Sequence, residues 1–130
     1  MKLIKCIIRQ DRLESVKKAL VDAGIGGMTV THCMGFGRQR GYREVYRGQE
    51  IEASFLPKTM VEVVVRDVDL ERTLALIVEN ARTGEPGDGR IFVVPVEETI
   101  RVRTGERGQK GIVRSAPIRA PYGARMGALF

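Results

Sequence analysis

The chain has 130 residues, of which 43% are hydrophobic and 29% charged, a composition typical of one globular domain with its own core. No apolar run approaches the roughly 18–20 residues of a membrane span, and Arg9 and Gln10 interrupt the N-terminal apolar stretch too soon for a signal peptide. We therefore expect a cytoplasmic protein without membrane insertion. Two cysteines, no C-x-x-C motif and one histidine argue against a disulfide framework or a zinc site.

The net charge of +6 is confined to the C-terminal segment. Residues 1–100 hold equal numbers of basic and acidic side chains, whereas residues 101–130 hold seven basic side chains and a single acidic one, Glu106. A high pI usually suggests nucleic-acid binding. Here the excess charge belongs to a terminal segment and not to a domain face, so no nucleic-acid partner is expected.

The first part of the chain predicts a strand, a helix and a second strand. Residues 2–9 alternate in the manner of a strand. Asp11 and Glu14 have the spacing of a capping box, which predicts a helix that begins at Asp11 and ends at Gly24. Residues 28–34 are alternating and β-branched, which predicts the second strand.

An irregular segment rich in glycine and arginine runs from about Gly35 to Lys58. A connection of this length is uncommon in a compact domain and is usually functional or disordered. Two alternatives stay open. We favour a mobile loop that becomes ordered on a ligand or partner. The other is a two-stranded ribbon in which REVYRG and EIEASF pair around Gly48.

The remaining pattern repeats the first unit. It predicts a strand over 59–66, a helix from an Asp69 N-cap to near Thr83, a strand over 91–96 and a short extended strand over 98–103. The order βαβ, loop, βαβ predicts an α+β, ferredoxin-like βαββαβ fold, with both helices on one face of an antiparallel sheet. Strand 59–66 carries apolar side chains on both faces, and no third layer is available. We therefore expect a symmetric oligomer to cover the second face.

Four features are candidates for an anion site. GFGRQRG places Gly35, Gly37 and Gly41 around Arg38 and Gln39, so that backbone N–H groups can approach a phosphate. TGEPGDGR (83–90) is glycine-rich but lacks the ending of a P-loop, and a plain turn is its alternative.

The other two features are basic side chains. Arg101 and Arg103 would project from one face of the expected strand 98–103, which suits bidentate phosphate binding; a solvated sheet edge is the alternative. Lys58 provides a point charge at the base of the long loop.

Taken jointly, these motifs resemble the PII nitrogen-regulatory signalling proteins. The resemblance runs from Met1 to about Glu106 and rests on GMTVT (27–31), GFGRQ (35–39), YRG (46–48), FLPK (55–58), TGEPGDGRIFV (83–93) and RVRTGE (101–106). It implies a homotrimer of ferredoxin-like subunits whose sheets face inward. Residues 1–106 would form the PII-type domain, residues 37–55 approximately its T-loop, and residues 107–130 a basic, flexible C-terminal extension.

The resemblance also implies ligand sites in the clefts between subunits. Adenine and ribose would be held at Thr29, Glu62 and Val64. ATP or ADP would further contact Gly35, Gly37, Arg38, Gln39, Lys58, Gly87, Asp88, Gly89, Arg90, Arg101 and Arg103. Beside MgATP, 2-oxoglutarate would bind at Gln39, Arg40, Gly41, Lys58 and Gly87. Mg²⁺ would be held by the phosphates, 2-oxoglutarate and Gln39.

The T-loop would dock onto a target protein such as an ammonium transporter or an enzyme of nitrogen metabolism. Its contact residues would be Tyr42, Glu44, Tyr46, Arg47, Glu50 and Ile51. Many bacterial members carry a uridylylated tyrosine at the position of Ile51, and others a phosphorylated serine at that of Gln49. We therefore expect no modification at Ile51 and control by ligands alone. Arg90 stands where the family usually has lysine.

Two other functions compete with this interpretation. A PII-like sensor of a different anion or metabolite, which binds nucleotide but does not respond to 2-oxoglutarate, is favoured by the changed loop tip and the added extension. It is opposed by Gln39 and Lys58. An RNA-recognition motif has the same element order but stacks bases on aromatic side chains of its middle strands, where Phe92 is the lone candidate here. No nucleophile–base pair accompanies His32, so no enzymatic function is expected beyond incidental ATP hydrolysis.

Overall fold

A computed structural model describes residues 1–37, 43–46, 49–52 and 55–112, and for 43–46 and 49–52 it describes the backbone. The strands in these residues are β1 (Lys2–Ile8), β2 (Thr29–Gly35), β3 (Arg43–Tyr46), β4 (Gln49–Glu52), β5 (Leu56–Val65) and β6 (Gly89–Pro95). The helices are α1 (Leu13–Asp22) and α2 (Leu70–Ala81), accompanied by the 3₁₀ turns η1 (Gln10–Arg12), η2 (Asp67–Asp69) and η3 (Gly108–Gly111).

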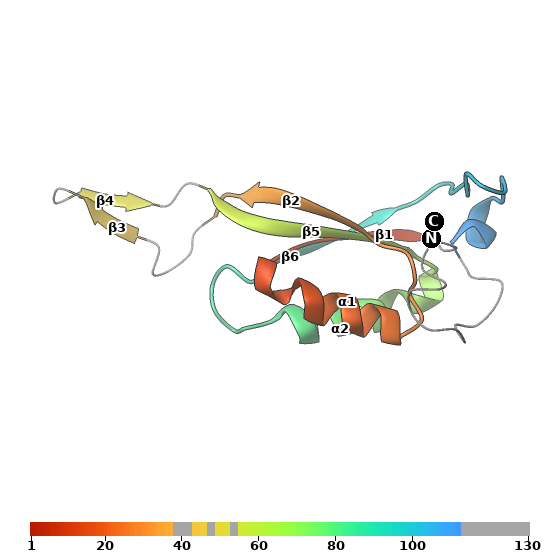
Figure 1. Cartoon of the computed structure of the whole chain (residues 1–130), viewed down its shortest axis with the longest axis horizontal. Helices are drawn as coiled ribbons and strands as arrows, with labels where there is room; N and C mark the ends of the chain where they lie inside the picture. Colours follow the sequence, from red (N-terminus) through yellow and green to blue (C-terminus); the bar gives the residue numbers. More distant parts are fainter. Residues whose placement is uncertain (38–42, 47–48, 53–54, 113–130) are drawn as a thin grey trace.

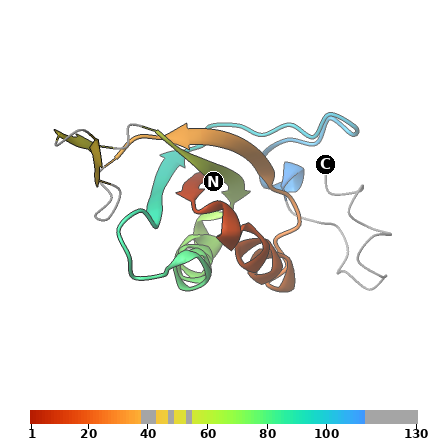
Figure 2. The ribbon, with the colours of Figure 1, turned by 60° about the vertical axis from the view of Figure 1, so that its left-hand side comes forward.

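The main sheet is antiparallel, with the strand order β2-β5-β1-β6. Both helices lie side by side on one of its faces (Figures 1 and 2). The two strands at the centre of the sheet come from different βαβ units, which confirms the predicted α+β, ferredoxin-like fold.

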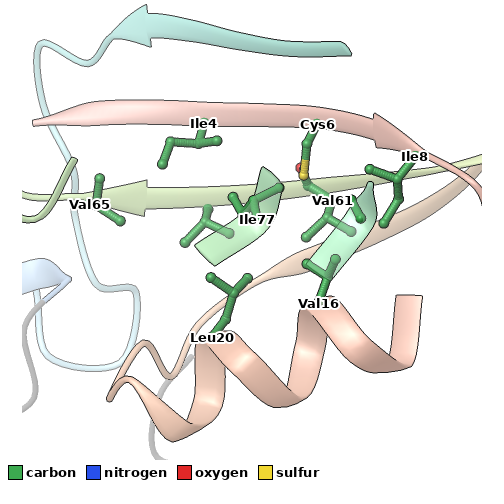
Figure 3. Close-up of a cluster of buried hydrophobic side chains, with 10 residues drawn as sticks. Ile4, Cys6, Ile8, Val16, Leu20, Val61, Val65 and Ile77 are labelled. Atoms are coloured by element: carbon green, nitrogen blue, oxygen red, sulfur yellow. The ribbon is translucent and has the colours of Figure 1, made fainter. Parts of the chain in front are cut away.

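The core lies between the sheet and the two helices (Figure 3). Alternate residues of β1 point into it, because side chains on a strand alternate between the two faces. The fully or almost fully buried members include Ile4, Cys6 and Ile8 of β1, Val61, Val63 and Val65 of β5, Val16 and Leu20 of α1, and Ile77 of α2. Burial raises the pKa of Cys6 to about 11, so this thiol stays protonated and packs as a small apolar group.

The opposite face of the sheet has no covering layer among the described residues. Phe92 and Val94 of β6 are 45% and 42% exposed, and Met60 and Val64 of β5 are half-buried. Phe92 pairs with Lys5, whereas its neighbour Ile91 pairs with the buried Cys6, so Phe92 belongs to the open face. Exposed apolar side chains gathered on one sheet face are typical of interaction surfaces.

α1 begins later than the sequence pattern suggests, whereas α2 begins directly after the predicted N-cap residue Asp69. Asp11 lies inside η1 and α1 starts at Leu13, without a side-chain capping hydrogen bond at either N-cap. The predicted start at Asp11 is therefore wrong. Asp69 does occupy the N-cap of α2, but its carboxylate accepts from Arg66 Nε at 2.9 Å and makes no cap hydrogen bond. α2 ends at Ala81, two residues before Thr83.

The predicted strand over 98–103 is wrong. Ile100 forms only an isolated bridge with Arg107, and residues 102–104 form a turn. The chain folds back because the N–H groups of Arg101 and Gly105 bond to the carbonyls of Glu106 and Arg101, at 2.8 and 2.7 Å. Residues 107–112, assigned to the extension, are part of this C-terminal turn, while residues 113–130 lie outside the described residues.

The long connection between β2 and β5 contains a two-stranded ribbon. β3 pairs antiparallel with β4, from Arg43 opposite Glu52 to Tyr46 opposite Gln49. The described residues therefore contain the two-stranded ribbon that was the alternative, whereas the mobile loop that orders on a ligand or partner stays a prediction. Residues 38–42, 47–48 and 53–54 of this connection lie outside the described part of the chain.

Candidate ligand-binding site

The glycine-rich segment between α2 and β6 closes around one carboxylate. Asp88 Oδ2 accepts from the backbone N–H groups of Thr83 and Gly84, each at 2.9 Å. Asp88 Oδ1 accepts from the hydroxyl of Thr83, whose oxygen in turn accepts from the Glu85 N–H at 3.1 Å. This segment, residues 83–90, is called the glycine loop below. It is a structured turn built on Asp88.

Arg9, which directly follows β1, forms hydrogen bonds to two residues of the same turn. Its Nε donates to Asp88 Oδ1 at 3.0 Å, and its Nη2 donates to the carbonyl oxygen of Pro86 at 2.8 Å. The side chains of Arg9 and Asp88 are only 23% and 26% exposed. Arg9 was not a candidate from the sequence, because the two partners are 79 positions apart and nothing local marks the contact.

The charge of Asp88 is stabilised by these donors. Partial burial raises the pKa of this carboxyl, but hydrogen bonds from Thr83, Arg9 and Gly84 outweigh that effect and hold the pKa well below its usual range. Asp88 is therefore an anion at every physiological pH, and its charge is directed into its own loop and toward Arg9.

Lys58 reaches the glycine loop from β5. Its Nζ donates to the carbonyl oxygen of Gly87 at 2.6 Å, and the residue is only 8% exposed. Burial lowers the pKa of Lys58, and the nearby Arg9 charge lowers it further, while Asp88 opposes both. A Cβ on Gly35 would lie 3.0 Å from Lys58 Cγ, so glycine at this position leaves room for the lysine stem.

The three positions expected near adenine and ribose lie together on the open face of the sheet. Thr29 and Glu62 are direct cross-strand partners on β2 and β5, and Val64 is the next residue of β5 on that face. Lys5 Nζ lies 4.0 Å from Glu62 Oε2. These positions share one surface with the exposed Phe92.

The expected phosphate and 2-oxoglutarate positions are only partly described. Gly35 ends β2, Gly37 is exposed with open space at its Cα, and Gly89 and Arg90 begin β6. Outside the described residues lie Arg38, Gln39, Arg40, Gly41, Tyr42 and Arg47. For the loop positions Glu44, Tyr46, Glu50 and Ile51, the backbone of β3 and β4 is what the structure describes.

Arg101 and Arg103 do not share the face of a strand, which corrects the sequence prediction. The Arg101 side chain is 9% exposed, with Nη1 3.5 Å from Glu106 Oε1. Arg103 lies exposed in the turn over residues 102–104. The physical reason is the chain reversal between Arg101 and Glu106, which replaces the extended backbone that alternation requires.

The candidate positions lie toward opposite ends of the main sheet (Figure 1). The glycine loop precedes β6, and the turn with Arg101 and Arg103 follows it. β6 has seven residues, so about 20 Å of strand separates the two groups at about 3.3 Å per residue. Within one chain, the two groups of basic side chains therefore do not converge on one phosphate.

Comparison of the sequence with known protein families identifies the family of this chain. The family model described as nitrogen regulatory protein P-II matches residues 1–106. The chain belongs to the P-II family. A nitrogen regulatory protein P-II of Azospirillum brasilense is 52% identical over 112 residues, which cover 86% of this chain and all of that relative.

Further P-II relatives have similar identities. The proteins from Rhodospirillum rubrum and Pasteurella multocida, with the same description, are 50% and 49% identical over 112 residues, again 86% of this chain and the whole relative. Membership of the nitrogen regulatory protein P-II family indicates that this chain is a regulatory protein. In the part of the chain that the structure describes, no helix has the length and apolar character needed to cross a membrane.

Proposed function

We propose that three copies of this P-II chain assemble with their open sheet faces inward and bind ATP or ADP in the clefts between subunits. 2-Oxoglutarate would bind beside MgATP. The connection between β2 and β5 would then act as the T-loop and dock onto a target such as an ammonium transporter or an enzyme of nitrogen metabolism. We further propose that the protein acts in the cytoplasm.

The observation that carries this proposal is the position of Lys58. A buried ammonium group lies at the base of the T-loop, donates to Gly87 of the glycine loop and sits beside the Arg9–Asp88 pair. A buried cation favours an anionic ligand, because the ligand charge offsets the desolvation of the lysine. A dicarboxylate that replaced the Gly87 carbonyl as acceptor would gain a charge-assisted hydrogen bond.

The separation of the candidate residues supports a site shared between two chains. One subunit would supply the glycine loop and Lys58, and its neighbour would supply Arg101 and Arg103 from the opposite end of its sheet. An intersubunit site would thereby bring the two basic groups together. The half-buried apolar side chains of the open face support the same assembly.

The described residues offer no metal site of their own, so Mg²⁺ would have to be bound together with ATP and 2-oxoglutarate. In this described part of the chain, no cluster of three His, Cys, Asp or Glu side chains could hold a metal ion. In the proposal, phosphate oxygens, 2-oxoglutarate and the Gln39 amide hold Mg²⁺, and the metal offsets charge where ATP and the dicarboxylate meet. Movement of Lys58 toward this ligand would break its bond to Gly87 and shift the base of the T-loop.

Isothermal titration tests the proposal. We expect 2-oxoglutarate to bind with measurable heat when MgATP is present and not in its absence. Lys58→Met should weaken 2-oxoglutarate binding by about thirtyfold or more, since truncating one member of a buried charge pair typically costs at least about 2 kcal/mol. Lys110→Met, a lysine exposed on the C-terminal turn, is the matched control and should leave binding unchanged.

Three results separate the alternatives. If 2-oxoglutarate bound equally well with and without MgATP, the proposal that the two ligands bind side by side would be contradicted. Binding of ATP without any response to 2-oxoglutarate would favour a PII-like sensor of another anion. Absence of binding to either ligand would exclude the proposed sensor altogether.

A further inference from the structure

Asp88 is the least expected member of the candidate nucleotide site, because it is an anion where an anionic ligand should bind. Two negative charges repel. Its carboxylate is already occupied by donors from Thr83, Gly84 and Arg9. The carboxylate therefore offers nothing to a phosphate directly, and its contacts lie within the loop that it organises and with Arg9.

The glycine loop has the construction of an anion-binding turn that carries its own anion. Consecutive backbone N–H groups converge on the Asp88 carboxylate, as they converge on a bound anion in a backbone nest. The Thr83 hydroxyl connects the carboxylate to the Glu85 N–H. The hydrogen bonds that shape residues 83–88 are thus made within the chain itself, without a ligand.

Arg9 completes this arrangement in two ways. Its guanidinium offsets the Asp88 charge at a separation of 3.0 Å, and its second contact at 2.8 Å holds the carbonyl of Pro86. Because Arg9 directly follows β1 and Gly89 pairs with Ile8, the contact fixes the loop relative to the central strand of the sheet. Gly87, Gly89 and Arg90, at the end of this loop and the start of β6, are thereby held in place relative to β1.

We propose that Arg9 and Asp88 are positioning residues that together pre-organise the glycine loop for nucleotide phosphate. This inference rests on the proposed nucleotide site. Asp88 acts as a built-in anion that sets the loop geometry, and Arg9 acts on nucleotide affinity through Asp88. Pre-organisation strengthens binding because the ordering of the loop is completed in the free protein.

The proposal predicts the sign of one substitution. If Asp88 were only a negative charge near the phosphates, Asp88→Asn would tighten ATP binding. If it positions the loop, Asp88→Asn weakens ATP binding in spite of the removed repulsion. Titration with ATP in the absence of 2-oxoglutarate, at low and at high salt, separates the two effects, since salt screens the charge effect and leaves the geometric one.

A double-mutant cycle tests whether Arg9 acts through Asp88. We expect Arg9→Ala and Asp88→Asn each to weaken ATP binding about tenfold, and the double variant to weaken it about tenfold as well, because coupled residues are not additive. A hundredfold loss in the double variant, unchanged affinity in either single variant or tighter binding by Asp88→Asn would overturn the inference. Lys18→Ala and Asp22→Asn remove an exposed helical ion pair and should leave ATP affinity unchanged.

Hydrogen exchange tests the loop independently of any ligand. The amides of Thr83 and Gly84 donate to Asp88, so peptides covering 83–90 should exchange slowly in the full-length protein and faster in Arg9→Ala. Equal exchange in both proteins would overturn the positioning role. If the unmodified protein binds no nucleotide, the proposed function fails, while this exchange result still decides whether Arg9 orders the loop.

Discussion

Two threonines are completely buried, and their hydroxyl groups have opposite surroundings. Thr59 of β5 packs opposite Ile8, and its Oγ1 has no hydrogen-bond partner in the described part of the chain. Thr73 of α2 donates to the carbonyl of Asp69 at 2.7 Å. A buried polar atom without a partner is destabilising, because it has lost its hydrogen bonds to water. The same substitution should therefore have opposite effects at the two sites.

We predict that Thr59→Val raises the free energy of unfolding by about 1 kcal/mol, since valine has the same shape and no polar atom to satisfy. Thr73→Val should lower it by about 1 kcal/mol, because a made hydrogen bond is lost. Urea titrations with equal slopes would measure both changes. A loss of stability in Thr59→Val comparable to that in Thr73→Val would contradict the prediction.

At the same scale, the sequence identified the glycine loop but not how it is held. The motif TGEPGDGR was noted as a glycine-rich stretch that could be an anion site or a plain turn, and Lys58 was noted from its place at the base of the long loop. The contacts of Arg9 could not be predicted, because a strand-end arginine has no local feature that names a partner 79 positions away. Asp88 as a ligand contact stays a prediction, and the sequence did not indicate that its carboxylate faces its own loop.

At the scale of elements, periodicity predicted the four strands of the main sheet and both helices, because each has one buried face with a regular spacing. Periodicity failed where hydrogen bonds, and not an alternating pattern, determine the backbone conformation. Alternation in R-V-R suggested a strand, but the bonds between Arg101 and Glu106 and the positive φ of Gly105 reverse the chain. The β3–β4 ribbon could not be preferred to a mobile loop from the sequence, because its short strands have too few residues on one consistent face.

The start of β6 depends on one glycine. Gly89 has φ +110°, and a Cβ at this position would lie 1.7 Å from the carbonyl oxygen of Ile7. Gly84, in the same loop, has φ +91°, but a Cβ there would have no other atom within 4 Å. Both glycines adopt a backbone conformation that disfavours other residues, yet only Gly89 also permits the close approach of β1.

We predict that Gly89→Ala lowers the free energy of unfolding by more than about 3 kcal/mol, because backbone strain and a clash with β1 add together. Gly84→Ala should cost about 1–2 kcal/mol, from strain alone. Urea unfolding followed by circular dichroism measures both. Equal losses in the two variants would show that the close approach to Ile7 contributes nothing.

At the scale of the whole molecule, the described residues cover the main sheet with helices on one face only. The helices bury Ile4, Cys6 and Ile8 on their side (Figure 3), while Phe92 and Val94 remain exposed on the other face. The sequence predicted this asymmetry from the apolar residues on both faces of β5. The sequence does not predict which surface covers the open face. Its patterns indicate how strands pair within one chain, but not how chains associate.

If the open face is the trimer interface, a charge placed in its middle should prevent assembly. Phe92→Glu would bury an unpaired carboxylate against neighbouring subunits, a cost of several kcal/mol that association cannot offset. We predict a monomer by size-exclusion chromatography with light scattering, with the far-ultraviolet circular dichroism of the unmodified protein. The folded core should survive, because Phe92 is 45% exposed in the single chain.

The matched control is Val68→Glu, at a residue of η2 that is 80% exposed and outside the open sheet face. It adds the same charge and should leave the assembly intact. The intersubunit site makes a second demand on Phe92→Glu: nucleotide binding should weaken together with assembly, since Arg101 and the glycine loop of different chains no longer meet. A Phe92→Glu monomer that still bound ATP with full affinity would place the nucleotide site within one chain and contradict the shared cleft.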